Sequence, residues 1–171
     1  MSTSVLVAYA TKYGSTEEVA EAIGETLREC GLDVEVRPAR EVRAIADYEA
    51  VVVGAALYMY RWHRDARRFL SRHRQALTER PVAIFALGPT HGPDHADEWR
   101  DSRAQLDKAL DRHGWLQPVD VELFGGMFDP AKLPFPINRF AGSEPASDAR
   151  DWEAIEGWVR KVAAQLAPGS T

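Results

Sequence analysis

Residues 5–16 read Val5-Leu6-Val7-Ala8-Tyr9-Ala10-Thr11-Lys12-Tyr13-Gly14-Ser15-Thr16, an apolar, β-branched run that ends in a turn rich in hydroxyl groups. Apolar residues then recur at helical spacing, at Val19, Ala20, Ile23 and Leu27. Ser15 and Glu18 have the spacing of a capping box, which predicts that a helix begins near Ser15 or Thr16. The stretch therefore predicts a strand, a tight turn and a helix.

The turn at 11–16 has the features of an anion site. The first backbone N–H groups of a helix have no intrahelical partner and lie at the positive end of its dipole. Thr11, Ser15 and Thr16 add three hydroxyl groups, and Gly14 can adopt the positive φ that curls a backbone around an oxyanion. The alternative is an ordinary strand-to-helix turn with a good cap.

The charges and glycines of this turn narrow the class of ligand. Lys12 is its only cation, and no Gly-Lys-Ser/Thr follows, so a nucleoside triphosphate with Mg²⁺ is not expected. Gly-x-Gly-x-x-Gly is also absent, which argues against a Rossmann pyrophosphate site. A neutral cluster of hydroxyl groups suits a single phosphate monoester.

Length and composition indicate one globular domain over residues 1–171. The net charge of -5 lacks the positive excess that is typical of nucleic-acid-binding proteins, so no nucleic-acid partner is expected. Cys30 is the only cysteine, which excludes an intramolecular disulfide and a Cys-based metal cluster. No basic leader precedes the first apolar run, and no run approaches the ~20 residues that span a bilayer. We expect a soluble cytoplasmic protein without an integral membrane segment.

Strand-like and helix-like segments alternate along the chain. The continuous apolar runs at 50–55 and 82–87 are typical of strands buried on both faces. A short strand around 34–36 is expected at a sheet edge, and a last strand covers 119–124. Helices are expected over 64–77, over 98–113 and after a cap at Asp151. This alternation predicts a parallel sheet with helices on both faces.

Ligands of such sheets bind outside the carboxyl ends of the strands, where the strand order reverses. Three loops leave those ends, at 11–16, 55–63 and 88–95. The second loop offers the aromatic side chains of Tyr58, Tyr60 and Trp62, for which burial in the core is the alternative. The third loop offers Gly and Pro, whose backbone N–H and C=O groups can approach a polar ring edge. A phosphate site beside a surface that can hold a planar ring matches the two ends of flavin mononucleotide (FMN), which is therefore the expected ligand.

These motifs resemble those of a known family. The turn Thr11-Lys12-Tyr13-Gly14-Ser15-Thr16 is similar to the phosphate loop of flavodoxins. Val53-Gly54-Ala55-Ala56-Leu57, followed by Trp62-His63, resembles the second loop of one branch, the menaquinone-dependent protoporphyrinogen dehydrogenases and their flavodoxin-domain relatives. Asp151-Trp152-Glu153 is also similar to that branch. The resemblance covers nearly the whole chain and implies an α/β, flavodoxin-like fold, a five-stranded parallel sheet in the order 2-1-3-4-5 with helices on both faces.

The resemblance also implies which residues bind FMN. The phosphate would be held by Thr11, Lys12, Tyr13, Gly14, Ser15 and Thr16. The isoalloxazine ring would be flanked by Ala55, Ala56, Leu57, Tyr58, Met59, Tyr60, Leu87, Gly88, Pro89 and Thr90. His63 matches a histidine of the branch and is the candidate catalytic residue, because its ordinary pKa near neutrality suits proton transfer or orientation of a substrate carboxylate. The alternative for His63 is a surface histidine at a helix start.

Departures from the family bear on the function. No tyrosine lies between Leu87 and Asp94, where many short electron-carrier flavodoxins stack one on the ring. The insert at about 127–150 is Pro-rich and weakly basic over 127–140, and Tyr58 stands where an arginine is common in the porphyrinogen branch. We expect an FMN-dependent oxidoreductase that passes electrons to a quinone-like or other small acceptor, on the lines of protoporphyrinogen dehydrogenase. The alternatives are a non-enzymatic electron carrier between redox proteins and a regulatory module that has lost its flavin.

Three further features remain. His91 and His95 have no carboxylate at ligand spacing, so no metal site is predicted. The arginine-rich face of 64–77 is expected to be solvated, with an acidic redox partner or peripheral contact with anionic lipid as the alternatives. The apolar and proline residues of the insert predict that it covers or flanks the flavin and shapes the acceptor pocket or a partner surface; the alternative is a cover for the edge of the core.

Overall fold

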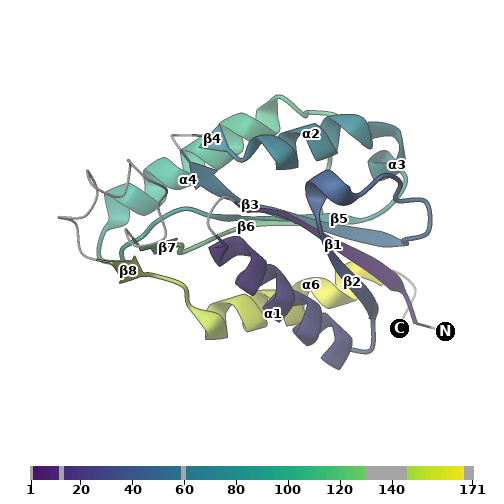
Figure 1. Cartoon of the computed structure of the whole chain (residues 1–171), viewed down its shortest axis with the longest axis horizontal. Coiled ribbons are helices and arrows are strands. Elements are labelled where there is room, and N and C mark those ends of the chain that lie inside the picture. The colour runs from purple at the N-terminus through teal and green to yellow at the C-terminus, as the bar shows by residue number, and fades with distance from the viewer. Residues whose placement is uncertain (1, 12–13, 59–60, 130–145, 168–171) are drawn as a thin grey trace.

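A sheet lies between two layers of helices (Figure 1). The computed structural model describes residues 2–11, 14–58, 61–129 and 146–167, and for Tyr58 it describes the backbone only. The parallel strands are β1 (Ser4–Ala10), β2 (Asp33–Pro38), β3 (Ala50–Tyr58), β5 (Val82–Leu87) and β6 (Asp120–Phe124). They lie in the order β2-β1-β3-β5-β6, and the two-residue strand β4 (Arg61–Trp62) folds back antiparallel on the end of β3. Counting the parallel strands along the chain, this is the predicted order 2-1-3-4-5.

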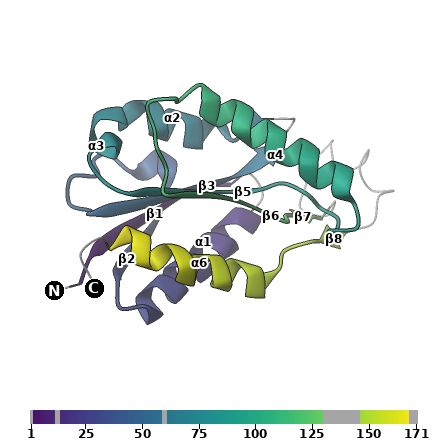
Figure 2. The ribbon, with the colours of Figure 1, turned by 180° about the vertical axis from the view of Figure 1, so that it is seen from behind.

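Helices cover both faces of the sheet, as predicted. One layer contains α1 (Ser15–Glu29) and α6 (Trp152–Leu166), and the other contains α2 (Arg64–Arg72), α3 (Arg74–Thr78) and α4 (Ala96–Asp111). Figures 1 and 2 show these layers from opposite sides. The 3₁₀ turn η1 (Ala39–Glu41) follows β2, and β7 (Met127–Phe128) pairs antiparallel with β8 (Ser147–Asp148) beside the main sheet. In the part of the chain that the structure describes, no helix is long and apolar enough to cross a membrane.

The continuous apolar runs are explained by two cores, one on each face of the sheet. Alternate residues of β3 point to opposite faces, so Val52 belongs to the core under α1 and α6, while Val51 and Val53 belong to the core under α2, α3 and α4. On β5, Phe85 enters the first core and Ile84 the second. A strand buried on both faces needs apolar residues at every position.

Several helix boundaries differ from the prediction. α1 begins at Ser15, but the predicted capping box does not form: the N-cap residue is Gly14 at φ 93°, with no side-chain cap. Glu18 forms an ion pair with Arg150 instead. The helix predicted over 64–77 breaks at His73 into α2 and α3. The helix predicted over 98–113 is α4, which covers 96–111. The cap at Asp151 is confirmed, since its Oδ1 accepts the Ala154 N–H at 3.0 Å.

Two buried histidines are expected to make the stability depend on pH. Burial is the main cause that lowers the pKa of His73 and of His113. At His73 a hydrogen bond to the Val42 backbone opposes this shift and the charge of Arg72 adds to it, while three nearby arginines add to it at His113. In the unfolded chain both histidines titrate near their ordinary pKa of 6.5. Above that pH both states are neutral and stability is complete. As the pH falls below it, the unfolded chain takes up protons that the folded protein does not, so stability is lost until the folded-state pKa is reached.

The melting temperature should therefore fall between about pH 7.5 and about pH 5.5, by roughly 2–4 °C for each kcal/mol lost. Thermal denaturation of the parent and of the His73→Gln/His113→Gln variant checks this result. The variant should show a flatter pH profile, whatever its absolute melting temperature. Equal slopes would mean that these two histidines do not cause the pH dependence.

Candidate functional site

The loop between β1 and α1 collects hydrogen-bonding groups at the carboxyl edge of the sheet. The Gly14 N–H donates to Thr11 Oγ1 at 2.8 Å, which ties the turn together. Thr16 is completely buried, and its Oγ1 has no hydrogen-bond partner among the described residues. Because a buried hydroxyl group without a partner costs about 1–3 kcal/mol, its position is best explained by a bound acceptor. The free amides of the first turn of α1 face the same kind of ligand, so the loop fits a phosphate group.

Carboxylates close to the loop limit the charge that it can hold. Tyr9 and Thr11 line a cavity together with Glu17, Arg40 and Asp65. Burial, together with the charge and hydrogen bond of the Glu17 carboxylate, raises the pKa of Tyr9 to about 12, so this phenol remains neutral. These carboxylates suit a monoester better than a polyphosphate. The predicted contacts of Lys12 and Tyr13 lie outside the described residues.

The three predicted loops leave neighbouring strands. The register pairs Ala10 with Ala55 and Ala56 with Leu87, so the ends of β1, β3 and β5 lie side by side. Within the second loop, Ala55 is buried, whereas Ala56 and Leu57 are half-buried at the end of the strand. The predicted ring contacts of Met59 and Tyr60, and of the Tyr58 side chain, lie outside the described part of the chain.

Trp62 belongs to the core and not to a ligand platform. Its side chain is buried, and its Nε1–H donates to the Ala55 carbonyl at 3.1 Å. The prediction that Trp62 joins an exposed aromatic cluster is therefore wrong. The cause is β4, which folds back on β3 and pairs Trp62 with Leu57. A two-residue strand of this kind has no periodic signal in the sequence.

His63 is the N-cap residue of α2. Its Nδ1 accepts the Asp65 N–H at 3.0 Å, and its own backbone N–H donates to the Ala56 carbonyl at 3.0 Å. Both bonds hold the ring beside the end of β3, in a groove that also reaches Thr11. Because Nδ1 accepts a hydrogen bond, the neutral ring carries its proton on Nε2. The side chain therefore has a structural role at the start of α2.

The third loop uses its backbone donors within the protein. The Gly88 N–H donates to the Phe124 carbonyl at 3.1 Å, and the Thr90 N–H donates to Glu98 Oε1 at 2.7 Å. Pro89 has no N–H, and its carbonyl accepts the Gly126 N–H at 2.6 Å. The prediction of backbone N–H groups aimed at the ring is therefore wrong for 88–90. The loop can offer a ring carbonyl oxygens and apolar surface.

Glu98 anchors this loop to α4, and the sequence analysis missed it. Its second oxygen lies 2.9 Å from His91 Nδ1, and Trp99 Nε1–H donates to the His91 carbonyl at 3.0 Å. Burial alone would raise the pKa of Glu98, but the hydrogen bonds from Thr90 and His91 outweigh it and hold that pKa below its ordinary value. His91 thus has a carboxylate partner that its spacing did not suggest. Among the described residues, no group of three or more potential ligands could hold a metal ion.

Replacing Glu98 by glutamine is expected to destabilise the protein by about 1–2 kcal/mol at neutral pH, since two bonds to a charged, partly exposed acceptor are weakened. A lowered folded-state pKa contributes stability that is present above the unfolded pKa and lost as the pH falls through the folded one. The melting difference from the parent should therefore be about 2–8 °C at neutral pH and shrink in acid. Asp101→Asn, an exposed carboxylate on the same helix, is the control; an equal effect there would contradict the anchoring role.

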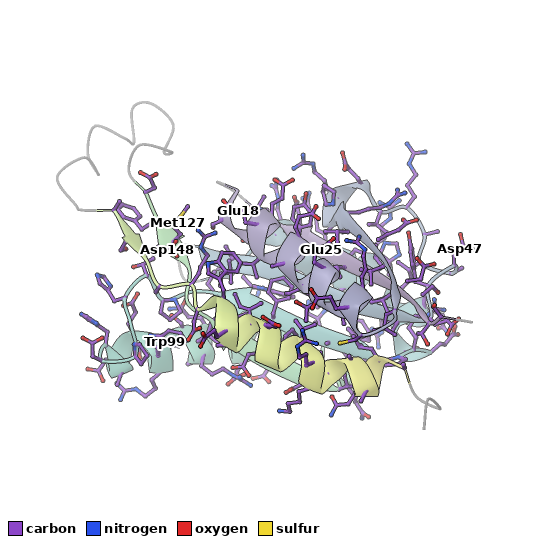
Figure 3. All side chains as sticks on the ribbon, turned by 90° about the horizontal axis from the view of Figure 1, so that it is seen from below. Glu18, Glu25, Asp47, Trp99, Met127 and Asp148 are labelled. Carbon is purple, nitrogen blue, oxygen red and sulfur yellow. The ribbon has the colours of Figure 1, made fainter. Side chains whose placement is uncertain are left out.

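Arg150 fastens the base of the insert to α1. Its guanidinium forms two bonds of 2.9 Å with Asp148, reaches Glu18 at 3.3 Å, and lies 5.0 Å from the centre of the Trp152 ring. Its side chain is only 7% exposed. Figure 3 shows Glu18, Met127 and Asp148 together at this end of the molecule. The predicted cover over the flavin falls mostly at 130–145, outside the described residues.

Comparison with known proteins agrees with this geometry. Residues 6–139, more than half of the chain, match the model of the Flavodoxin domain family. The chain belongs to the flavodoxin domain family. This membership confirms the resemblance seen in the sequence and identifies FMN as the cofactor, with a flavodoxin-type redox role.

Individual relatives are distant from the chain. The protoporphyrinogen IX dehydrogenase [quinone] of Escherichia coli K12 is 23% identical over 176 residues, covering 92% of this chain and 93% of that protein. A flavodoxin from the domain Archaea superposes with a TM-score of 0.60 at 16% identity, over 96% of this chain and 99% of its own. Flavodoxin 2 from Bacillus cereus gives a TM-score of 0.61 at 16% identity, over 95% and 99%. At these identities the two structures support the fold alone.

Proposed function

We propose that this flavodoxin-family chain is an FMN-dependent oxidoreductase that passes electrons from a donor to a quinone-like or other small acceptor. The third loop carries the proposal. No Phe, Tyr or Trp lies between Leu87 and Trp99, so the loop has no aromatic side chain that could stack on the flavin ring. Its backbone is fixed by hydrogen bonds to Glu98 and Gly126. One face or edge of the ring is therefore left accessible to a small molecule. The E. coli relative, named as a quinone-dependent dehydrogenase, supports the same class of acceptor.

The residues of the three loops have distinct roles in this proposal. Thr16 Oγ1, the Ser15 hydroxyl and the first amides of α1 bind the phosphate. The end of β3 and the 87–90 loop flank the ring, and FMN supplies the redox chemistry when bound. His63, fixed by its cap bond, uses Nε2–H to orient an acceptor oxygen or to move a proton. The proposal also includes a single domain with an insert at about 127–150 that shapes acceptor choice, and a cytoplasmic location.

Anaerobic mixing of the photoreduced protein with menadione tests this function. We expect rapid reoxidation, followed by the return of the oxidised flavin absorbance. His63→Asn is the matched variant, because asparagine is also a good N-cap acceptor but lacks Nε2–H. It should bind FMN and melt like the parent, while its reaction with menadione slows by about tenfold or more. Slow reoxidation of the parent that accelerates only when a redox protein is added would identify a carrier instead.

A further inference from the structure

Cations without carboxylate partners gather on the α2–α4 face of the molecule. Residues 61–74 contain six arginines and one aspartate, although the whole chain has a net charge of -5. Within the described ranges, no carboxylate pairs with any of these six arginines, nor with Lys108 of α4 or Arg112 directly after that helix. By contrast, Arg28 and Arg160 on the α1–α6 face each contact a glutamate. Among the described residues, cations without a carboxylate partner thus concentrate at 61–74 and at the C-terminal end of α4, although Arg100 and Arg103 of the same helix pair with aspartates.

Part of this cluster lines two hollows that share residues, beside the first and second loops. Between β4 and α4, a cavity is bordered by Arg61, Arg67, Lys108 and Arg112, with the buried Trp62 at its base. A second hollow shares Arg61 and Arg67 and continues past His63 and Arg64 to Arg40 and Thr11. We call the surface formed by Arg40, Arg61, Arg64, Arg67, Lys108 and Arg112 the basic groove. Among the described residues that line the two hollows, Asp65 at the start of α2 is the only carboxylate.

The basic groove lies next to the proposed flavin site. It begins at Thr11 in the phosphate loop, and Trp62 at its base donates to the carbonyl of Ala55, where the second loop begins. Figure 1 shows β4, α2 and α4 on the same side of the sheet. A molecule seated in the groove would therefore lie at the edge of the sheet where the three flavin loops meet.

We infer that the basic groove binds the acidic face of a small redox protein that exchanges electrons with the flavin. This inference rests on the proposed function and names a partner for the same site. Clustered like charges repel one another, and an acidic partner relieves that repulsion while it steers the encounter. Each encounter transfers one electron from the reduced partner; two encounters, with two protons from water, complete the two-electron reduction of FMN.

The shape and composition of the surface favour a protein over a membrane. A protein that binds anionic lipid through a basic face usually also inserts exposed apolar side chains. Among the described residues, Trp152 is the one large hydrophobic side chain that is exposed, and it lies on α6 in the opposite helix layer. A groove with a buried tryptophan at its base suits a protruding acidic segment better than a flat lipid surface.

The experiment compares two triple variants with the same net charge. Arg61→Gln/Lys108→Gln/Arg112→Gln neutralises three exposed cations of the groove, and Arg28→Gln/Arg160→Gln/Lys161→Gln neutralises three on the opposite layer. The probe is a plant-type two-iron ferredoxin, a small acidic one-electron carrier. Its Kd for each FMN-loaded protein is measured by calorimetry at about 20 mM and at about 0.5 M NaCl, together with the rate at which its reduced form reduces the flavin.

Only the groove variant should bind the ferredoxin about tenfold more weakly at low salt and accept its electrons correspondingly more slowly. High salt should remove the difference between the variant and the parent. Equal loss in both triple variants, or no loss in either, would overturn the inference. Sedimentation with phosphatidylserine vesicles is measured for the parent and for the groove variant. If the variant binds ferredoxin like the parent but no longer sediments with vesicles that the parent binds, the inference is overturned and the groove is a membrane-binding surface. Normal FMN titration and menadione kinetics in these cases would leave the proposed function standing.

Discussion

Replacing Thr16 by aspartate is expected to weaken FMN binding by about a hundredfold or more, while riboflavin binding changes little. The parent hydroxyl group is completely buried and has no partner among the described residues, and we propose that a phosphate oxygen is its acceptor. A hydrogen bond to a charged group contributes about 1.5–3 kcal/mol, and the new carboxylate adds repulsion against the phosphate. Fluorescence titration of the apoprotein with each flavin measures the two affinities.

Two milder variants keep this prediction testable if the aspartate disturbs folding. Thr16→Ser retains the hydroxyl group and should bind FMN nearly as well as the parent. Thr16→Val retains the shape but not the hydrogen bond, and should lose about tenfold in FMN affinity or more. A parallel loss of riboflavin affinity in Thr16→Val would show that the phosphate binds elsewhere.

Replacing Gly54 by alanine is expected to destabilise the fold by about 3 kcal/mol, which lowers the melting temperature by roughly 6–12 °C. A Cβ at this position would lie 1.9 Å from two ring atoms of Phe85. The ring has little room to move, because it packs against Phe124 and Trp158 at centroid distances of 6.3 and 6.4 Å. Gly54 thus makes room for the buried ring of Phe85 on the neighbouring strand.

A compensating change separates this clash from a general loss of β3. Gly54→Ala/Phe85→Leu should recover part of the stability that Gly54→Ala loses, because the smaller side chain vacates the space. Gly157→Ala in α6 is the control, since nothing lies within 4 Å of its Cβ and alanine favours a helix. Similar melting temperatures for Gly54→Ala and Gly157→Ala would contradict the packing account.

Local patterns were enough to predict the sheet. The runs at 50–55 and 82–87 are apolar at every position because helices cover both faces, and such strands stand out in any sequence. The positive φ of Gly14 was likewise readable, since few other residues adopt it. The turn at 11–16 was predictable because a strand, a glycine turn and a helix start are contiguous in the chain; phosphate binding by this turn stays a prediction.

The contacts that the sequence did not reveal join distant residues. Glu18 fits a capping box locally, but Arg150, 132 positions away, takes its carboxylate. Glu98 reaches back eight residues to Thr90, a spacing that matches no helical or strand period. Trp62 looked like part of an aromatic loop because the pairing of β4 with β3 depends on a tertiary turn. In each case the two residues come into contact only when the chain folds, so the local sequence pattern does not reveal the contact.

Titration of the unmodified apoprotein with FMN and with riboflavin tests the central claim most directly. If the 11–16 loop binds a phosphate, FMN should bind at one equivalent with a shifted flavin absorbance spectrum, and riboflavin should bind at least about tenfold more weakly. Equal affinity for the two flavins, or no binding of either, would contradict the account.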